Sequence, residues 1–105
     1  MVDTNYISSI VKILEPPNTI LFNDTILVTR FRVQFPQVQN SQIVNLICWD
    51  HLASYVSNYY QTNDYIMIEG YLSLNSKYLL NKGNQNSKKF EITILKIYPF
   101  LRSCN

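Results

Sequence analysis

The chain has 105 residues, of which 47% are hydrophobic and only 15% charged, and its formal net charge is +2. This length fits one domain, and the apolar content excludes a chain that is disordered throughout. The sequence has no apolar run of the roughly 18–20 residues that a membrane span needs, and its start does not resemble a signal peptide. We therefore expect one domain over residues 1–105, with a core from about residue 5 to 101, a short tail over 102–105 and no membrane attachment.

The basic residues are concentrated in two stretches of the sequence. Residues 25–49 contain Arg30 and Arg32, and residues 70–90 contain four lysines, namely Lys77, Lys82, Lys88 and Lys89. These two stretches hold six of the nine basic residues and none of the seven acidic ones. Such a distribution suits an anionic partner, although chance and solvated loops would give the same pattern.

The first two predicted strands are separated by a pair of prolines and a turn. Residues 6–14 are rich in β-branched side chains and form the first strand. Pro16-Pro17 ends it, because proline cannot donate to a sheet ladder, and Asn23-Asp24-Thr25 is a turn signal. Residues 25–35 form the second strand, whose apolar side chains change phase near Thr29-Arg30. This change predicts a β-bulge.

The third predicted strand, residues 43–49, leads into the only convincing helix. Alternation places one set of side chains in the core (Val44, Leu46, Cys48) and the other outside (Ile43, Asn45, Ile47, Trp49). Asp50 is the expected N-cap of the helix, and Asn63 the expected left-handed C-cap. Between them runs an apolar stripe of helical period, formed by Leu52, Tyr55, Val56, Tyr59 and Tyr60.

Two further strands complete the pattern. Residues 65–74 alternate, with Ile66, Ile68, Leu72 and Leu74 as core positions. Residues 76–89 form a polar, basic hairpin loop, and residues 90–101 form the last strand. Five strands with one helix between the third and the fourth follow the order of an OB-fold barrel, one end of which the helix closes. We therefore predict an all-β, five-stranded OB-fold Greek-key barrel with one α-helix between strands 3 and 4.

Residues able to carry out catalysis are not grouped in the sequence, so an enzyme is not expected. The sole histidine, His51, would lie in the first turn of the helix, where a charged imidazole is disfavoured. The acidic residues are scattered, and the two glycines do not form a phosphate-binding loop. Two cysteines, Cys48 and Cys104, are too few for a four-ligand metal site, and we expect both to be reduced. The sequence predicts no metal and no cofactor.

An outward surface for binding is the better-supported feature. Trp49 lies on the outward side of the third strand, and Arg30 and Arg32 point outward from the second. Aromatic rings stack on bases and cations neutralise phosphates, which is how proteins bind single-stranded nucleic acid. We expect Trp49 to stack and the arginines to bind phosphates, with help from Phe35, Tyr71, Tyr78, Lys77, Lys82, Lys88 and Lys89. A packing role for Trp49 at the barrel end is the alternative interpretation.

Several segments resemble the bacterial-type single-stranded DNA-binding protein (SSB) family, over nearly the whole chain from Asn5 to about Leu101. Residues 46–53 (LICWDHLA) resemble the family's apolar strand, aromatic residue and helix start. Residues 66–72 (IMIEGYL) resemble its V-x-V-E-G-x-L strand. More narrowly, a short SSB-like family encoded in algal plastids and cyanobacteria is similar at Glu15-Pro16-Pro17, Val33-Gln34-Phe35-Pro36 and Cys48-Trp49.

The resemblance implies an OB-fold that binds single strands without strong sequence preference and assembles as a homo-oligomer, a dimer or a tetramer. Trp49 falls on a family position where an aromatic ring stacks on a base. Ile43 and Asn45 replace a second aromatic and a basic residue of the family, and Tyr78 lies one place from an expected stacking ring. The family's acidic-tipped tail is not found in the sequence. We therefore expect weaker affinity than in a full SSB and no recruitment of partners through such a tip.

Two functional hypotheses follow. The first is single-stranded DNA binding in plastid DNA replication or repair, where the plastid location rests on the resemblance and on a bias towards residues with AT-rich codons, such as twelve Asn and twelve Ile. The second is an OB-fold protein-interaction module or primosome-type subunit with weak or no nucleic-acid binding. Asn45 and the apolar outward pair Ile43 and Ile47 favour this alternative.

Overall fold

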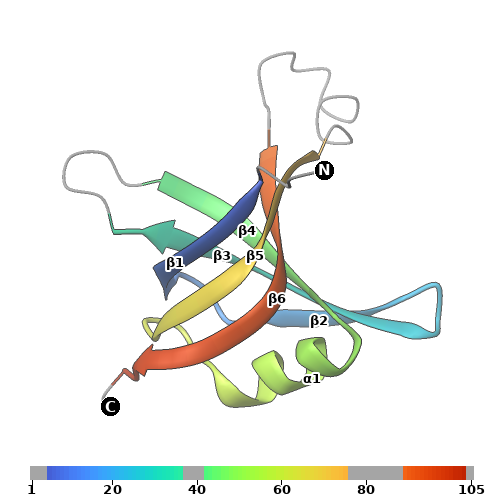
Figure 1. Cartoon of the computed structure of the whole chain (residues 1–105). Helices are drawn as coiled ribbons and strands as arrows, with labels where there is room; N and C mark the ends of the chain where they lie inside the picture. Colours follow the sequence, from blue (N-terminus) through green and yellow to red (C-terminus); the bar gives the residue numbers. More distant parts are fainter. Residues whose placement is uncertain (1–4, 37–41, 76–88, 104–105) are drawn as a thin grey trace.

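The computed structural model describes residues 5–36, 42–75 and 89–103. Its elements in chain order are β1 (Tyr6–Ile13), β2 (Asn18–Phe22), β3 (Ile26–Phe35), β4 (Gln42–Trp49), α1 (Asp50–Tyr59), β5 (Tyr65–Asn75) and β6 (Lys89–Leu101). The sheet order is β1-β5-β6-β4-β3-β2, and β1 also pairs with β3, so that five of the strands close into a barrel (Figure 1). This architecture confirms the predicted OB-fold.

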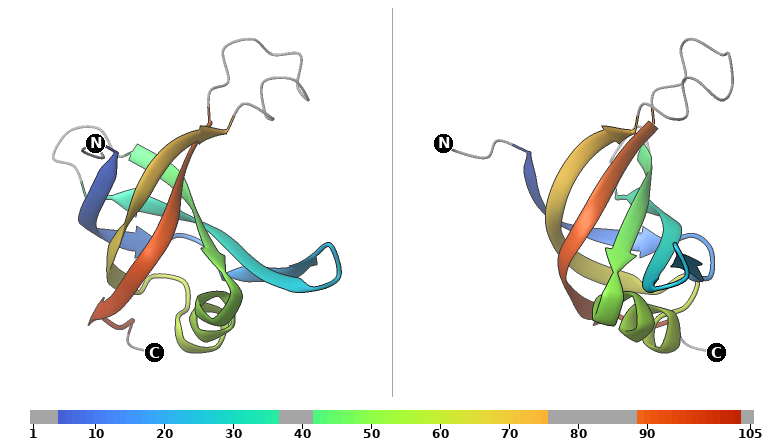
Figure 2. Two further views of the ribbon diagram at one scale, coloured as in Figure 1. Left: turned by 45° about the vertical axis from the view of Figure 1, so that its right-hand side comes forward. Right: turned by 90° about the vertical axis from the view of Figure 1, so that its right-hand side faces the viewer.

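Strand β2 is an addition to the predicted strands. It follows the two prolines and pairs antiparallel with the first half of β3 from Asn18–Arg30 to Phe22–Ile26. Asn23 and Asp24 have positive φ angles of 56° and 63°, as in a type I′ turn, and thus confirm the predicted turn. The two strands run past the barrel as a two-stranded arm (Figure 2).

The inward side chains of the barrel form one apolar core. Val11, Phe31, Leu46 and Ile66 are each at most 1% exposed. On β4, Cys48 is buried with Leu46, which confirms the predicted inward positions of that strand. Burial raises the pKa of the Cys48 thiol to about 12, because the thiolate would lose its solvation.

The predicted bulge in the second strand is wrong. Strand β3 keeps one continuous register with both of its neighbours through Thr29 and Arg30. The change of phase instead arises because Val28 is buried on the outer side of β3, where its neighbours in register are Ile20 and Trp49. The irregularities of the sheet lie between β5 and β6, where register shifts occur next to Ile66 and Gly70.

Helix α1 lies across one end of the barrel (Figure 1), and its packing differs in detail from the prediction. Ala53, Val56 and Tyr60 are the positions buried in the core. Tyr55 and Tyr59, predicted to belong to the apolar stripe, are exposed and stack on each other with ring centroids 4.9 Å apart. The hydroxyl of Thr29 donates to the Ala53 carbonyl at 2.8 Å and so connects the helix to β3.

The helix ends also differ from the predicted caps. Asp50 does not cap the helix: the N-cap position is Trp49, without a side-chain cap, and Asp50 is the first helical residue, with a φ of 58°. At the other end the cap is Tyr60, whose N–H donates to the Val56 carbonyl. Asn63 has the predicted left-handed conformation, with a φ of 74°, but its N–H donates to the Ile13 carbonyl at 2.8 Å. It thus connects the turn after the helix to β1.

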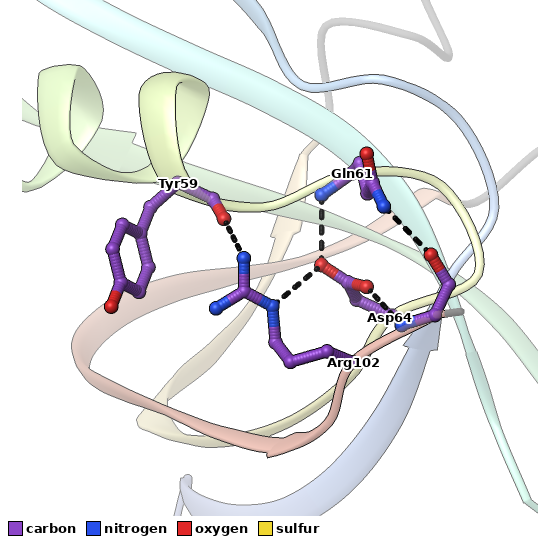
Figure 3. A network of polar contacts seen from close by, with 5 residues as sticks. Tyr59, Gln61, Asp64 and Arg102 are labelled. Atoms are coloured by element: carbon purple, nitrogen blue, oxygen red, sulfur yellow. Dashed lines mark hydrogen bonds and ion pairs between the residues drawn. The ribbon is translucent and has the colours of Figure 1, made fainter. Parts of the chain in front are cut away.

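A buried carboxylate fastens the end of β6 to the end of the helix (Figure 3). Asp64 is fully buried and accepts hydrogen bonds from the backbone N–H groups of Gln61 and Ser103, at 3.0 and 2.7 Å. Arg102 lies 3.6 Å from the same carboxylate and donates to the Tyr59 carbonyl at 2.8 Å. An arginine at this position satisfies a helix C-terminal carbonyl and compensates the buried charge.

Candidate nucleic-acid interface

The outer side of β2, β3 and β4 brings the predicted stacking residue and both predicted arginines together. We call this surface the arginine face and define it by Phe22, Arg30, Arg32 and Trp49. Residues paired in register across antiparallel strands share a side of the sheet. Arg30 pairs with Ile47, and Val28 with Trp49, so the arginines and Trp49 point outward together. The predicted outward direction of these three side chains is confirmed, and their role in binding stays a prediction.

Trp49 is the last residue of β4 and is 37% exposed. The left-handed conformation of Asp50 turns the chain sharply from the strand into the helix directly after the ring. Asp and Asn adopt this conformation more readily than other residues that have a Cβ. Trp49 therefore lies at the corner between the barrel and the arm, with part of its ring open to solvent.

Phe22 contacts Trp49 from the arm. The two ring centroids are 5.8 Å apart and the ring planes meet at 88°, an edge-to-face arrangement. Phe22 is 44% exposed. It was not among the predicted site residues, because β2 itself is absent from the predicted strands. The available signal was the uncharged, β-branched segment Asn18–Phe22 in front of a strong turn.

Each arginine of the face is paired with a carboxylate. Arg32 donates from Nε to Oε1 of Glu15 at 3.1 Å, and its backbone N–H donates to Oε2 of the same residue at 3.0 Å. An Nη of Arg30 lies 3.9 Å from Oε2 of Glu91. The sequence has no acidic residue in the stretch around the arginines. The fold brings two to them, Glu91 from β6 and Glu15 from the segment after β1. The local positive charge is therefore lower than the sequence pattern indicates.

The Glu91 carboxylate is a charged group beneath the arginine face. Glu91 is 7% exposed, and its Oε2 finds no hydrogen-bond donor among the described residues. Since β4 lies between β3 and β6, the Arg30 side chain must reach across β4 to approach it. This path accounts for the burial of Ile47, which points outward but is only 4% exposed. Arg30 therefore compensates a buried charge in addition to facing solvent.

The other predicted site residues lie apart from Trp49 or outside the described residues. Tyr71 is on the outer side of β5, edge-on to Tyr6. Phe35 is partly buried and packs against the core. Lys89 begins β6, and its side chain lies outside the described part of the chain, as do Lys77, Tyr78, Lys82 and Lys88.

The outward apolar pair that favoured a protein interface is not jointly exposed. Ile43 is 55% exposed, but the burial of Ile47 removes it from the surface. This part of the alternative hypothesis is therefore wrong. Ile43 and Trp49 remain as the exposed apolar side chains on the outer side of β4.

Three further features of the described residues were predicted or excluded from the sequence: a metal site, a membrane span and the surroundings of His51. Within residues 5–36, 42–75 and 89–103, no group of three or more His, Cys, Asp or Glu could hold a metal ion. No helix in this part of the chain is long and apolar enough to span a membrane. His51 lies with Thr25, Leu27 and Ser54 around an open pocket between the arm and the helix.

The chain is similar in sequence to a known protein. A curated protein of Trieres chinensis, named "Putative single-stranded DNA-binding protein ycf41", is 37% identical over 103 aligned residues, which span 92% of this chain and 89% of that protein. No protein-family model matches the chain.

Solved structures with the same fold include the following two. The SSB domain of a Synechococcus sp. protein superposes with a TM-score of 0.74 at 20% identity, covering 93% of this chain and 98% of that one. The second single-stranded DNA-binding protein (SSBb) of Mycobacterium smegmatis has a TM-score of 0.72 at 23% identity, with 90% and 87% covered.

Proposed function

Because the chain belongs to the single-stranded DNA-binding protein family, we propose that it binds single-stranded DNA and that the strand lies on the arginine face. The observation that carries the proposal is the exposed Trp49 ring, which lies on the same outer surface as Arg30 and Arg32. An exposed ring offers a stacking surface to any base, at about 1–3 kcal/mol each, and arginines bind phosphates. Readout by stacking and charge alone would give little sequence preference.

The basic segment between β5 and β6 completes this proposal. Lys77, Lys82, Lys88 and Lys89 are proposed phosphate ligands, and Tyr78 is proposed as a further ring. Tyr71, which pairs edge-on with Tyr6, lies apart from the arginine face and is not part of this proposal. Cations that neutralise phosphates release counterions, so binding should weaken as salt rises. The segment follows β5 directly and leads into β6, which pairs with β4 from Asn45–Glu91 to Ile47–Thr93.

We place this activity in plastid DNA replication or repair. The support is the relationship to the ycf41 protein of Trieres chinensis and the bias towards residues with AT-rich codons. We also propose a homo-oligomer, a dimer or a tetramer. The support for this is the relationship to the SSB family.

The only tryptophan provides the test. Trp49 fluorescence is followed during titration with an oligothymidylate, at low and at physiological salt. Strong quenching that weakens steeply with salt is the expected result, because the ring stacks and the cations contact phosphates. The proposal would be contradicted if the titration at low salt gave no quenching and no mobility shift.

A second candidate function follows from the paired arginines. If Glu15 and Glu91 hold Arg32 and Arg30 permanently, the face has little charge to offer a phosphate and the domain acts as a protein-interaction module. Binding of a protein partner that persists at high salt, together with no binding of oligothymidylate, is the result expected of this candidate.

A further inference from the structure

The arm carries more exposed apolar surface than its own packing requires. Three consecutive residues of β2, namely Ile20, Leu21 and Phe22, are 44–57% exposed, and none of the five residues of this strand is charged. Ile20 and Phe22 lie on the side of the arm that faces Trp49, because Ile20 shares a register row with Val28 and Trp49. Exposed apolar clusters beside a binding residue are typical of ligand contact.

The relative orientation of the Phe22 and Trp49 rings leaves ring surface free. At 88°, one ring presents an edge and the other a face, so the contact occupies a single ring face. A parallel stack would occupy two. Both side chains are more than one third exposed, so part of the remaining ring surface is open to solvent. Each of the two rings therefore keeps solvent-exposed surface that is available for a base.

We propose that Phe22 is a second stacking residue, which binds the base next to the one on Trp49. The inference rests on the proposed function, since it assumes that a single strand lies on the arginine face. Phenylalanine has no hydrogen-bonding group, so this position would be indifferent to base identity. The perpendicular rings require the strand to turn at this corner, from the barrel onto the arm. Phe22 thereby supplies a ring that the strand β4 itself lacks at Ile43.

The test compares Phe22→Leu with Phe100→Leu in binding to a labelled oligothymidylate, followed by anisotropy. Leucine keeps an apolar side chain but removes the ring. Phe22→Leu should weaken binding about fivefold or more. Phe100 is 52% exposed on β6 and serves as the matched control, so its variant should bind within about twofold of the unaltered chain. Phe22→Tyr keeps the ring and should also bind within about twofold.

A double variant separates stacking by Phe22 from support of Trp49. In a Trp49→Leu background, Phe22→Leu should still weaken binding by the same factor. If the factor disappears there, Phe22 acts only through Trp49 and the proposal is overturned. Circular dichroism establishes that each variant is folded, and Phe22→Met, a second variant without a ring, should reproduce the loss.

The two levels of the proposal fail differently. If the unaltered chain does not bind oligothymidylate, the proposed function fails and the inference fails with it. If the unaltered chain binds, Trp49→Leu weakens that binding and both Phe22→Leu and Phe22→Met bind normally, only the role of Phe22 is wrong.

Discussion

Two outer surfaces of the barrel present aromatic pairs of nearly the same geometry. On the arginine face, Phe22 and Trp49 meet edge-on with centroids 5.8 Å apart. On the outer side of β1, β5 and β6, which we call the tyrosine face after Tyr6, Tyr71 and Tyr98, the rings of Tyr6 and Tyr71 meet at 71° with centroids 5.7 Å apart. Ring exposure and ring geometry therefore do not distinguish the two surfaces.

The charged neighbours of the rings do distinguish them. The Tyr6 hydroxyl donates to the Glu69 carboxylate at 2.6 Å, so the tyrosine face has an acid at its centre. This hydrogen bond raises the pKa of Tyr6, because it stabilises the neutral phenol and opposes a second negative charge. The arginine face has its carboxylates beneath or beside guanidinium groups that reach solvent. Two guanidinium groups lie on the arginine face with its rings, whereas the exposed lysine of the tyrosine face, Lys96, lies opposite Glu69 in register. We therefore expect an anionic strand to prefer the arginine face.

The largest expected effect is a loss of stability of the whole barrel, which carries both surfaces. Gly70 lies on the inward side of β5, and a Cβ at this position would overlap the carbonyl oxygen of Thr93 on β6. Because that neighbour is backbone, Gly70→Ala should lower the free energy of unfolding by roughly 3 kcal/mol or more. Urea unfolding measures it, with the exposed Ser73→Ala on the same strand as the control. A loss below about 1 kcal/mol would show that β6 can shift away.

The second effect compares the loss of one aromatic ring from each of the two faces. Trp49→Ala should weaken binding to an oligothymidylate by about 1–3 kcal/mol, through loss of stacking. Tyr98→Ala removes a ring of similar exposure from the tyrosine face and should leave the dissociation constant unchanged. Equal losses in both variants, measured by anisotropy, would show that the strand wraps around both surfaces.

The third effect tests how the carboxylates of the two faces change DNA binding. Glu91→Gln removes the carboxylate that pairs with Arg30, which then becomes free to bind a phosphate. Binding should tighten about two- to fivefold, because the pair is 3.9 Å apart and its arginine is half exposed to solvent, so that freeing the arginine costs less than about 1 kcal/mol. The slope of log K against log salt should become steeper by about 0.7, the value for one phosphate of a single strand. Glu69→Gln removes an equal charge from the tyrosine face and is the control. Weaker binding in Glu91→Gln would mean that Glu91 orients Arg30 for the strand.

The smallest effect concerns the hydroxyl of the tyrosine face. Tyr6→Phe deletes its hydrogen bond to Glu69 and should change the free energy of unfolding only slightly, because the group is exposed. The size of this change depends on pH. A raised pKa stabilises the fold below the ordinary tyrosine pKa, and this contribution is lost as the pH rises past it. The difference between the two proteins should therefore shrink in alkaline urea unfolding, and DNA binding should be the same in both.

The parts of the fold that follow from local periodicity could be predicted from the sequence. The alternation in residues 43–49 places Leu46 and Cys48 inside and Trp49 outside, as observed, because one face of the strand is buried. The outward direction of Arg30 and Arg32 follows in the same way. Strand β2 could not be predicted with the same rule, since its side chains are exposed on both sides of the arm and do not alternate in burial.

The parts that depend on contacts between distant residues could not be predicted. The ion pairs of Arg30 with Glu91 and of Arg32 with Glu15 join segments that are far apart in the sequence. Asp64 resembles an ordinary polar residue before a strand, yet the fold buries it against Ser103 and Arg102. The acid-free stretches of the sequence therefore overstate the free positive charge of the site.

The pairing of β4 with β6 is a short seam of the barrel, and this affects how the barrel opens. Antiparallel pairing of β5 with β6 runs from Tyr65–Leu101 to Asn75–Lys89, whereas β4 and β6 pair in parallel only from Asn45–Glu91 to Ile47–Thr93. Short parallel pairings are weaker, so the amide hydrogens of this seam should exchange with solvent before those between β5 and β6. The Arg30–Glu91 pair spans the seam from β3 to β6. A DNA strand that draws Arg30 away from Glu91 would therefore loosen the barrel along one line while it rigidifies the surface above.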